Sequence, residues 1–189
     1  PFFAESPLYF YYPEFDKVEN AHFMPAFERG MQEHLAEIEA IANQSEAPTL
    51  DNTLIPMERS GQTLDRVATV FFSLTSANTN DEMETIRSEM APKLSAHRDQ
   101  ILLNSKLFAR IQGIYDQRES LELDPESLRL VEENYKDFIR AGAKLSDADK
   151  EILKVVNAAI NSTNELAQWL HQESDSKTGP SGIGKENYR

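Results

Sequence analysis

The chain has 189 residues, with 32 acidic and 19 basic side chains and a formal net charge of -13 at pH 7. This balance excludes a nucleic-acid partner, because such binding depends on Lys and Arg that neutralise phosphates, and it disfavours anionic membranes. No apolar run approaches the roughly 18 residues that a membrane span requires. The acidity has two interpretations, a solvated surface or an attraction for cationic substrates.

Cysteine is absent, which excludes disulfides, thiolate chemistry and cysteine-bound metals. Its absence leaves both a cytoplasmic and a periplasmic location open. The chain starts at Pro1 instead of Met, and its first residues lack the basic flank of a signal peptide. We therefore expect that residues upstream were removed or left out.

Residues 1–18 combine three prolines with seven aromatic side chains. Proline at this density prevents a helix, and so many rings are seldom left in water. We predict an extended segment pinned across a helical surface. If the chain is a piece of a larger protein, some of these rings are instead an interface that has lost its partner.

Helical periodicity begins at Asn20, where apolar residues recur every three or four positions for about twenty residues. After a turn, a second stripe covers residues 50–71, with Thr49 as its N-cap. Pro56 and Gly61 interrupt this stripe, so we expect a kink or break between residues 57 and 61.

A third apolar stripe covers residues 83–101, with Asn80 as candidate cap and Pro92 inside it, where proline can bend the helix. A fourth, shorter helix is predicted from Ser105 to about residue 118. No run with the two-residue period of a strand competes with these patterns.

The fifth and sixth helices have the clearest starts. Asp124 is a cap followed by proline at the first helical position, and Ser146 begins a variant of the capping box. We therefore predict an all-α fold of about six amphipathic helices in an antiparallel bundle or array. The helical domain covers residues 19–174, and the glycine-rich residues 175–189 form either a flexible C-terminal tail or a linker to further sequence.

Histidine offers no metal site from spacing alone. A zinc-binding helix carries two histidines on one face, as in H-E-x-x-H, and no histidine here has such a partner. We interpret His34 as a surface pair with Glu33, and His97, on an apolar stripe, as a core or semi-buried side chain. A site assembled from distant helices stays open. The four histidines are His22, His34, His97 and His171.

Other catalytic motifs are also missing. Carboxylate pairs such as Glu33 with Glu37 are unavoidable among 32 acids and indicate solvated faces. The glycines near Lys185 lack the spacing of a phosphate loop, and no G-x-S-x-G elbow occurs. Phe71, Phe72 and the methionines fit an ordinary core, with a groove for a partner helix as the alternative. We predict no catalytic and no metal-binding residue in this chain.

Eight short stretches, in the same order, resemble the N-terminal region of bacterial peptidyl-dipeptidases, also called dipeptidyl carboxypeptidases. These enzymes are zinc metallopeptidases of the thimet oligopeptidase family. The similarity covers roughly residues 1–165. The stretches are PFFAES (1–6), PEFDK (13–17), PTLDNT (48–53), ERSG (58–61), SANTND (76–81), RESL (118–121), LRLVE (128–132) and AGAKL (141–145).

The resemblance implies a helical segment that forms one wall of a deep channel, which admits only short unfolded peptides. It also implies that the zinc, its ligands and the glutamate base lie several hundred residues further on, so that this chain is inactive alone and meets peptides through a catalytic domain in the same or a partner chain. Asn78 and Asn80 are the candidate channel-facing residues.

The end of the chain departs from this family. From Trp169 onward it looks more like a different group of helical bacterial metallopeptidases of unassigned function. The alternative function is a stand-alone helical module that binds peptides or a partner helix through the aromatic residues of the first eighteen positions.

Overall fold

Helices make up most of the described chain, and no strand occurs in residues 1–177. The computed structural model describes the backbone of residues 1–177 and the side chains of residues 1–163. Six helices are long and α2 is short, which confirms the predicted all-α fold. The helices are α1 (Phe23–Ala42), α2 (Ile55–Arg59), α3 (Gln62–Ala77), α4 (Asp81–Leu102), α5 (Ser105–Gln117), α6 (Pro125–Arg140) and α7 (Asp147–Lys177).

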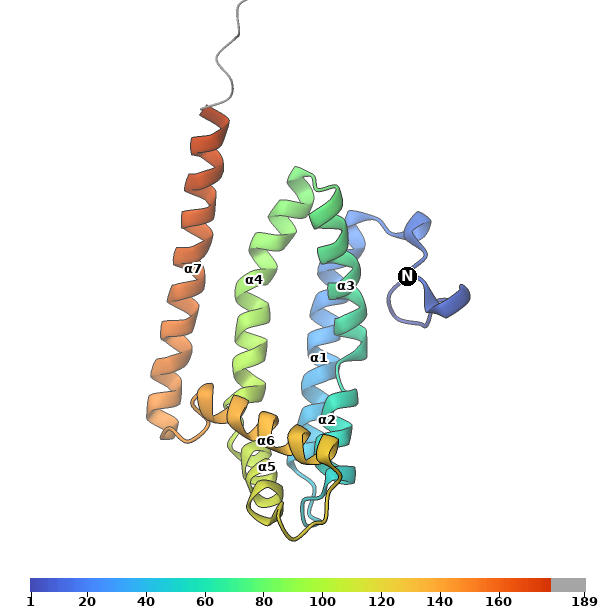
Figure 1. Cartoon of the computed structure of the whole chain (residues 1–189). Helices are drawn as coiled ribbons and strands as arrows, with labels where there is room; N and C mark the ends of the chain where they lie inside the picture. The colour runs from blue at the N-terminus through green and yellow to red at the C-terminus, as the bar shows by residue number, and fades with distance from the viewer. Residues whose placement is uncertain (178–189) are drawn as a thin grey trace, which may run out of the picture.

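Helices α1, α3, α4 and α7 run side by side (Figure 1). Helices α1, α3 and α4 lie together, α7 lies on the far side of α4, and α5 and α6 cross the lower end. A tight turn joins α3 to α4, so these two helices run in opposite directions. None of the described helices is long and apolar enough to cross a membrane.

Helices α4, α6 and α7 begin where side-chain caps satisfy their first backbone N–H groups. Asn80 accepts a hydrogen bond from the Met83 N–H at 3.0 Å and starts α4. Asp124 accepts from the next two N–H groups beyond Pro125 and starts α6. The Ser146 hydroxyl accepts from the Asp149 N–H and donates to its carboxylate at the start of α7. All three predicted starts are confirmed.

The second predicted helix is broken, as Pro56 and Gly61 indicated. It divides into a π-helical turn (Leu50–Leu54), α2 and α3. Ser60 is extended, and Gly61 lies in the left-handed region with φ of 75°, where a side chain is strained. The Glu37 carboxylate of α1 accepts the Gly61 N–H at 2.7 Å and fixes the break against α1.

Two hydrophobic clusters form the core, and α1 contributes to both. The first half of α1 packs with α3, α4 and Phe2, whereas the second half packs with α5, α6 and the π-helical turn. Gly30, between the two, lets α3 approach closely, since a Cβ there would lie 2.9 Å from the Leu64 backbone. The largest fully buried side chains are Phe23, Phe27, Phe71, Phe138, Ile38, Leu54, Met90, Leu107, Ile111, Ile114, Val67 and Val70.

The N-terminal segment differs from its prediction. It is a chain of three 3-10 turns (Tyr9–Tyr11, Phe15–Lys17 and Asn20–His22), and it is pinned mainly at Phe2, whose ring packs 5.3 Å from Phe23. The expectation that its rings cover the helical surface is wrong for most of them. Only Phe2 of the seven rings is buried, at 3% exposed.

The C-terminal boundary also shifts. Helix α7 continues to Lys177, so residues 175–177 of the predicted tail are helical. The remaining tail, which includes the glycines near Lys185, lies outside the described residues.

Candidate functional site

The predicted channel residues Asn78 and Asn80 lie at the turn between α3 and α4, and both are exposed. Asn78 ends α3, and its N–H donates to the Leu74 carbonyl at 2.8 Å. The Asn80 side chain caps α4 and also accepts a 3.3 Å hydrogen bond from Asn20. Asn80 therefore stabilises the start of α4 and its link to the N-terminal segment.

Two histidines that are 63 positions apart meet in the interior between α1 and α4. The His97 Nε2 atom lies 3.0 Å from the His34 Nδ1 atom, and the His34 Nε2 atom lies 3.1 Å from the Ser60 hydroxyl. His97 is only 6% exposed, as expected for a stripe residue. The interpretation of His34 as a surface pair with Glu33 is wrong, because Glu33 pairs with Arg29 at 2.7 Å and His34 turns inward.

The hydrogen-bond network assigns the protons of this pair. The Ser60 hydroxyl donates to the Met57 carbonyl at 2.6 Å, so it accepts from His34 Nε2–H. The His34 Nδ1 atom is then unprotonated and accepts from His97 Nε2–H. This leaves His97 Nδ1 as a buried acceptor without a partner. This arrangement requires both rings to be neutral, because a proton added to His34 Nδ1 would turn the acceptor of the His97 N–H into a donor.

Burial keeps both rings neutral. It lowers the pKa of His97 to about 4, with a further lowering from His34. It also lowers the pKa of His34, against an opposing effect of the Glu37 carboxylate. Within the described residues no group of three His, Asp or Glu side chains could hold a metal ion. The His34–His97 pair forms a polar contact between α1 and α4.

The remaining candidates have structural roles. His22 accepts the Glu19 N–H at 3.0 Å and so closes a 3-10 turn. Glu132 lies within 4 Å of Lys136 and Arg118 on the surface. Side-chain contacts of His171 lie outside the described residues. Of the two acids named as a carboxylate pair in the sequence, Glu33 forms an ion pair with Arg29, whereas Glu37 accepts the Gly61 N–H.

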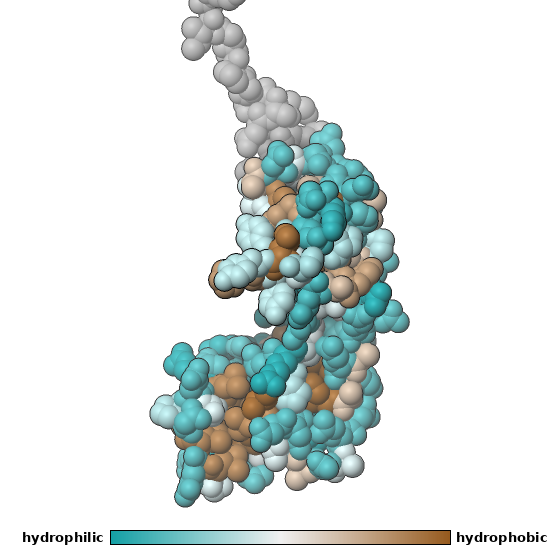
Figure 2. Space-filling model, turned by 90° about the vertical axis from the view of Figure 1, so that its right-hand side faces the viewer, coloured by the Kyte–Doolittle hydropathy of each residue, from teal (hydrophilic) through white to brown (hydrophobic). Residues whose placement is uncertain are grey.

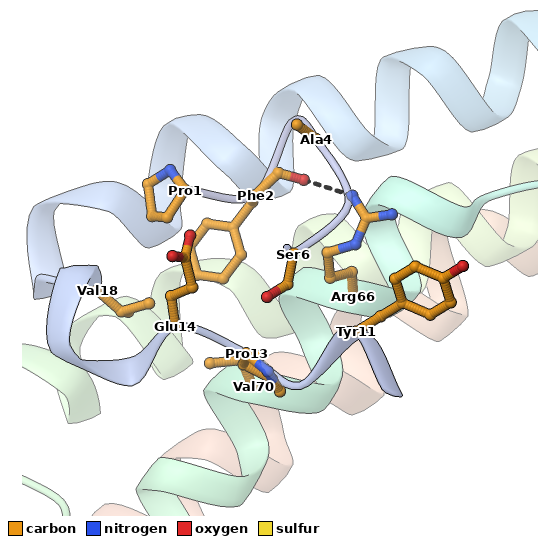
Figure 3. A pocket seen from close by; sticks show the side chains of 10 residues that line it. All are labelled: Pro1, Phe2, Ala4, Ser6, Tyr11, Pro13, Glu14, Val18, Arg66 and Val70. Atoms are coloured by element: carbon orange, nitrogen blue, oxygen red, sulfur yellow. Dashed lines mark hydrogen bonds between the residues drawn. The ribbon is translucent and has the colours of Figure 1, made fainter. Parts of the chain in front are cut away.

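A small cavity lies beneath the N-terminal segment (Figure 3). Its volume of about 30 Å³ suits a single water molecule. The Arg66 guanidinium donates to the Phe2 carbonyl at 2.7 Å and closes one side, while Glu14 and Val70 lie on the other. This cavity is too small for a substrate, and its walls serve to hold the segment on α3.

The 3-10 turn Tyr9–Tyr11, next to this cavity, projects its aromatic rings into solvent. Tyr9 is 84% and Phe10 86% exposed, and Tyr11 and Tyr12 are also largely exposed. Phe10 and Tyr11 both have positive φ, which is costly for aromatic residues. Figure 2 looks onto this side of the molecule and shows a projection above a notch. No sequence signal distinguishes these exposed rings from the buried Phe2.

A larger open cavity of about 630 Å³ lies between α4, α6 and α7. Its walls carry Arg98, Asp99, Asp137 and Arg140. Two of these pair with each other, since Arg140 lies 3.2 Å from Asp137. The cavity has charges of both signs and so favours neither an anionic nor a cationic ligand.

The comparisons with known proteins identify peptidases. No family profile matches the chain. The dipeptidyl carboxypeptidase of Escherichia coli (strain K12) is 44% identical over 171 residues, which cover 90% of this chain and 25% of that protein. The dipeptidyl carboxypeptidase of Salmonella typhimurium (strain LT2) is 45% identical over 157 residues, which cover 83% and 23% respectively.

These matches confirm the resemblance to the N-terminal region of a peptidyl-dipeptidase that the eight short stretches indicated. The chain spans about a quarter of the length of the relatives it matches. The identity is spread over almost the whole chain and is not confined to a motif.

Proposed function

We propose that this chain is the helical wall of the substrate channel in a zinc-dependent peptidyl-dipeptidase, an enzyme that releases C-terminal dipeptides from short peptides. The observation that carries the proposal is 44% identity with a dipeptidyl carboxypeptidase over 90% of this chain but only 25% of the relative. The sequence contains no H-E-x-x-H, and the described residues offer no metal-ligand group. The wall therefore restricts substrate size, and the zinc and its ligands belong to another part of the polypeptide.

The proposal requires that the chain alone is inactive. Incubation of the chain with zinc and a blocked tetrapeptide, followed by mass spectrometry, is expected to show no released dipeptide. The E. coli relative serves as positive control under the same conditions. Release of a dipeptide by the isolated chain would overturn the inactivity.

Within this proposal, Asn78 and Asn80 face the peptide channel at the turn between α3 and α4. Both are exposed and their amide groups can form hydrogen bonds with a peptide backbone. Asn80 also caps α4, so Asn80→Asp is the informative variant because it keeps the cap while changing the amide.

The test places the variants in a chimera, in which this chain replaces the matched segment of the E. coli relative. Rates of cleavage are measured for peptides of increasing length. Asn78→Ala and Asn80→Asp are expected to change the length preference. An unchanged preference in a folded chimera would remove both residues from the channel.

The projecting rings favour a second candidate function, a stand-alone module that binds peptides or a partner helix. Four neighbouring aromatic side chains in solvent are typical of an interface. Calorimetric titration with short peptides, and separately with the catalytic part of the relative, discriminates between the two. Binding of peptides by the chain alone favours the module, and binding of the catalytic part alone favours the wall.

A further inference from the structure

Helix α7 presents an apolar stripe to solvent. The stripe consists of four aliphatic side chains; Val155 and Val156 lie three and four positions after Ile152, and Ile160 lies four positions after Val156, so all four share one broad face of the helix. Helices at a protein surface normally turn such a face toward the core. The exposed fractions of the side chains are 62% for Ile152, 70% for Val155, 45% for Val156 and 51% for Ile160.

The face of α7 toward the rest of the chain makes polar contacts with α4. Leu153 lies on this face, against Gly142, and Ile160 is at the edge of the stripe, where it also lines the open cavity between α4, α6 and α7. The Asn157 amide donates to both oxygens of Asp99, at 3.1 and 3.0 Å, and the Asn161 amide donates to the Ser95 hydroxyl at 2.6 Å. Near the start of the helix, buried Lys150 donates to the Ser105 hydroxyl at 2.6 Å.

These contacts fix the rotation of α7 about its axis. Turning the apolar stripe toward α4 would carry the Asn157 and Asn161 amides into solvent and leave Asp99 and Ser95 of α4 without their hydrogen-bond donors. The outward position of the stripe is therefore a consequence of specific contacts on the inner face.

We propose that the stripe docks on an apolar surface that belongs to the part of the peptidase polypeptide that has no counterpart in this chain. The relatives contain about three quarters of their length beyond the match, which supplies a partner of sufficient size. A complementary apolar helical surface would cover the stripe of Ile152, Val155, Val156 and Ile160. The inference rests on the proposed function, because it takes this chain to be one region of such a peptidase.

The absence of cysteine from this chain permits a direct test. Val155→Cys places one thiol in the stripe, and Glu151→Cys places a control thiol on the flank of the same helix, where the Glu151 side chain is 72% exposed. The rate of alkylation of each thiol is measured by mass spectrometry of the α7 peptide. The measurement is made in the isolated chain and in the chimera with the E. coli relative.

In the isolated chain the two thiols are expected to react at similar rates. In the chimera the ratio of the Val155→Cys rate to the Glu151→Cys rate is expected to fall by about tenfold, because a covered side chain reacts only when the interface opens. An unchanged ratio in a folded chimera would overturn the proposal. A ratio that falls in the isolated chain as its concentration rises would also overturn it, because a second copy would then cover the stripe.

Activity of the chimera separates this proposal from the proposed function. A fall in the ratio without release of dipeptides leaves the docking surface standing and contradicts the functional role. Dipeptide release with an unchanged ratio supports the functional role and contradicts the docking surface.

Discussion

The lower end of the molecule and helix α7 differ in whether their side chains find partners within the chain. At the lower end, Arg110 of α5 is 7% exposed, and its guanidinium donates to the Gln44 and Glu46 carbonyls and to the side chains of Asn52 and Thr53. These partners come from the loop after α1 and from the π-helical turn. Every group in this network finds its partner within the chain.

Helix α7 is only partly covered by contacts of this kind. Polar groups on its inner face form hydrogen bonds with α4, while its apolar stripe lies in solvent. The rings at Tyr9–Tyr11 of the N-terminal segment also lie in solvent. The comparison distinguishes a region that stabilises itself from surfaces that fit a role within a larger assembly. Substitutions should therefore be costly near Arg110 and nearly neutral on the open surfaces of the isolated chain.

Loss of the Arg110 side chain is expected to have the largest effect. Arg110→Ala leaves two carbonyls and two polar side chains without their donor, which should lower the free energy of unfolding by about 4 kcal/mol. Urea denaturation measures this value. The control Arg129→Ala, on the exposed face of α6, should change it by less than about 0.5 kcal/mol. A similar small loss for both variants would contradict the closed network.

Because the His34–His97 pair is neutral in the folded chain, we predict that the protein loses stability in acid. The unfolded chain protonates a histidine near pH 6.5, whereas the pKa of His97 in the folded chain is about 4. Its contribution is therefore complete above pH 6.5 and is lost as the pH falls from 6.5 to 4. The expected loss is about 3 kcal/mol.

The His97→Gln variant isolates this contribution from the acids that titrate in the same range. Denaturation of both proteins between pH 7.5 and 4 should show that the stability of the variant falls less steeply. The lowered pKa of His34 acts in the same direction, because the ring also gains affinity for protons on unfolding. Parallel curves for the two proteins would show that the pair carries no pH dependence.

Local patterns predicted the helices because their signals lie within a few residues. The apolar stripes, the caps at Asn80, Asp124 and Ser146, and the break at Gly61 were all found in the sequence. The pairing of His34 with His97 was missed, because it depends on how α1 and α4 pack across 63 positions. The one local signal was the place of His97 on an apolar stripe.

Which aromatic rings are buried could not be predicted either, because burial also depends on long-range packing. Phe2 is buried while Tyr9 is in solvent, yet both lie in the same segment of prolines and aromatic residues. Burial here depends on which rings reach Phe23 and α3, and the composition of the segment does not determine this. The outward stripe of α7 also required the contacts of Asn157 and Asn161 with α4.

Within the N-terminal segment, removal of a buried ring is expected to lower the free energy of unfolding more than removal of an exposed ring, although both effects are smaller than those above. Phe2→Ala removes a buried ring and should lower the free energy of unfolding by about 2 kcal/mol, less than in a closed core because a terminal segment can relax. Tyr9→Ala removes an exposed ring and should change it by less than about 0.5 kcal/mol. Thermal unfolding monitored by circular dichroism measures both. Equal effects would show that the projecting rings are packed in solution.

Activity of the chimera is the most direct test of the central claim that this chain is the channel wall of a peptidyl-dipeptidase. In the chimera, residues of this chain replace the matched 171 residues of the E. coli dipeptidyl carboxypeptidase. We expect the chimera to release C-terminal dipeptides from a blocked tetrapeptide and to leave a folded protein uncleaved. A folded chimera that releases no dipeptide, or that cleaves the folded protein, would contradict it.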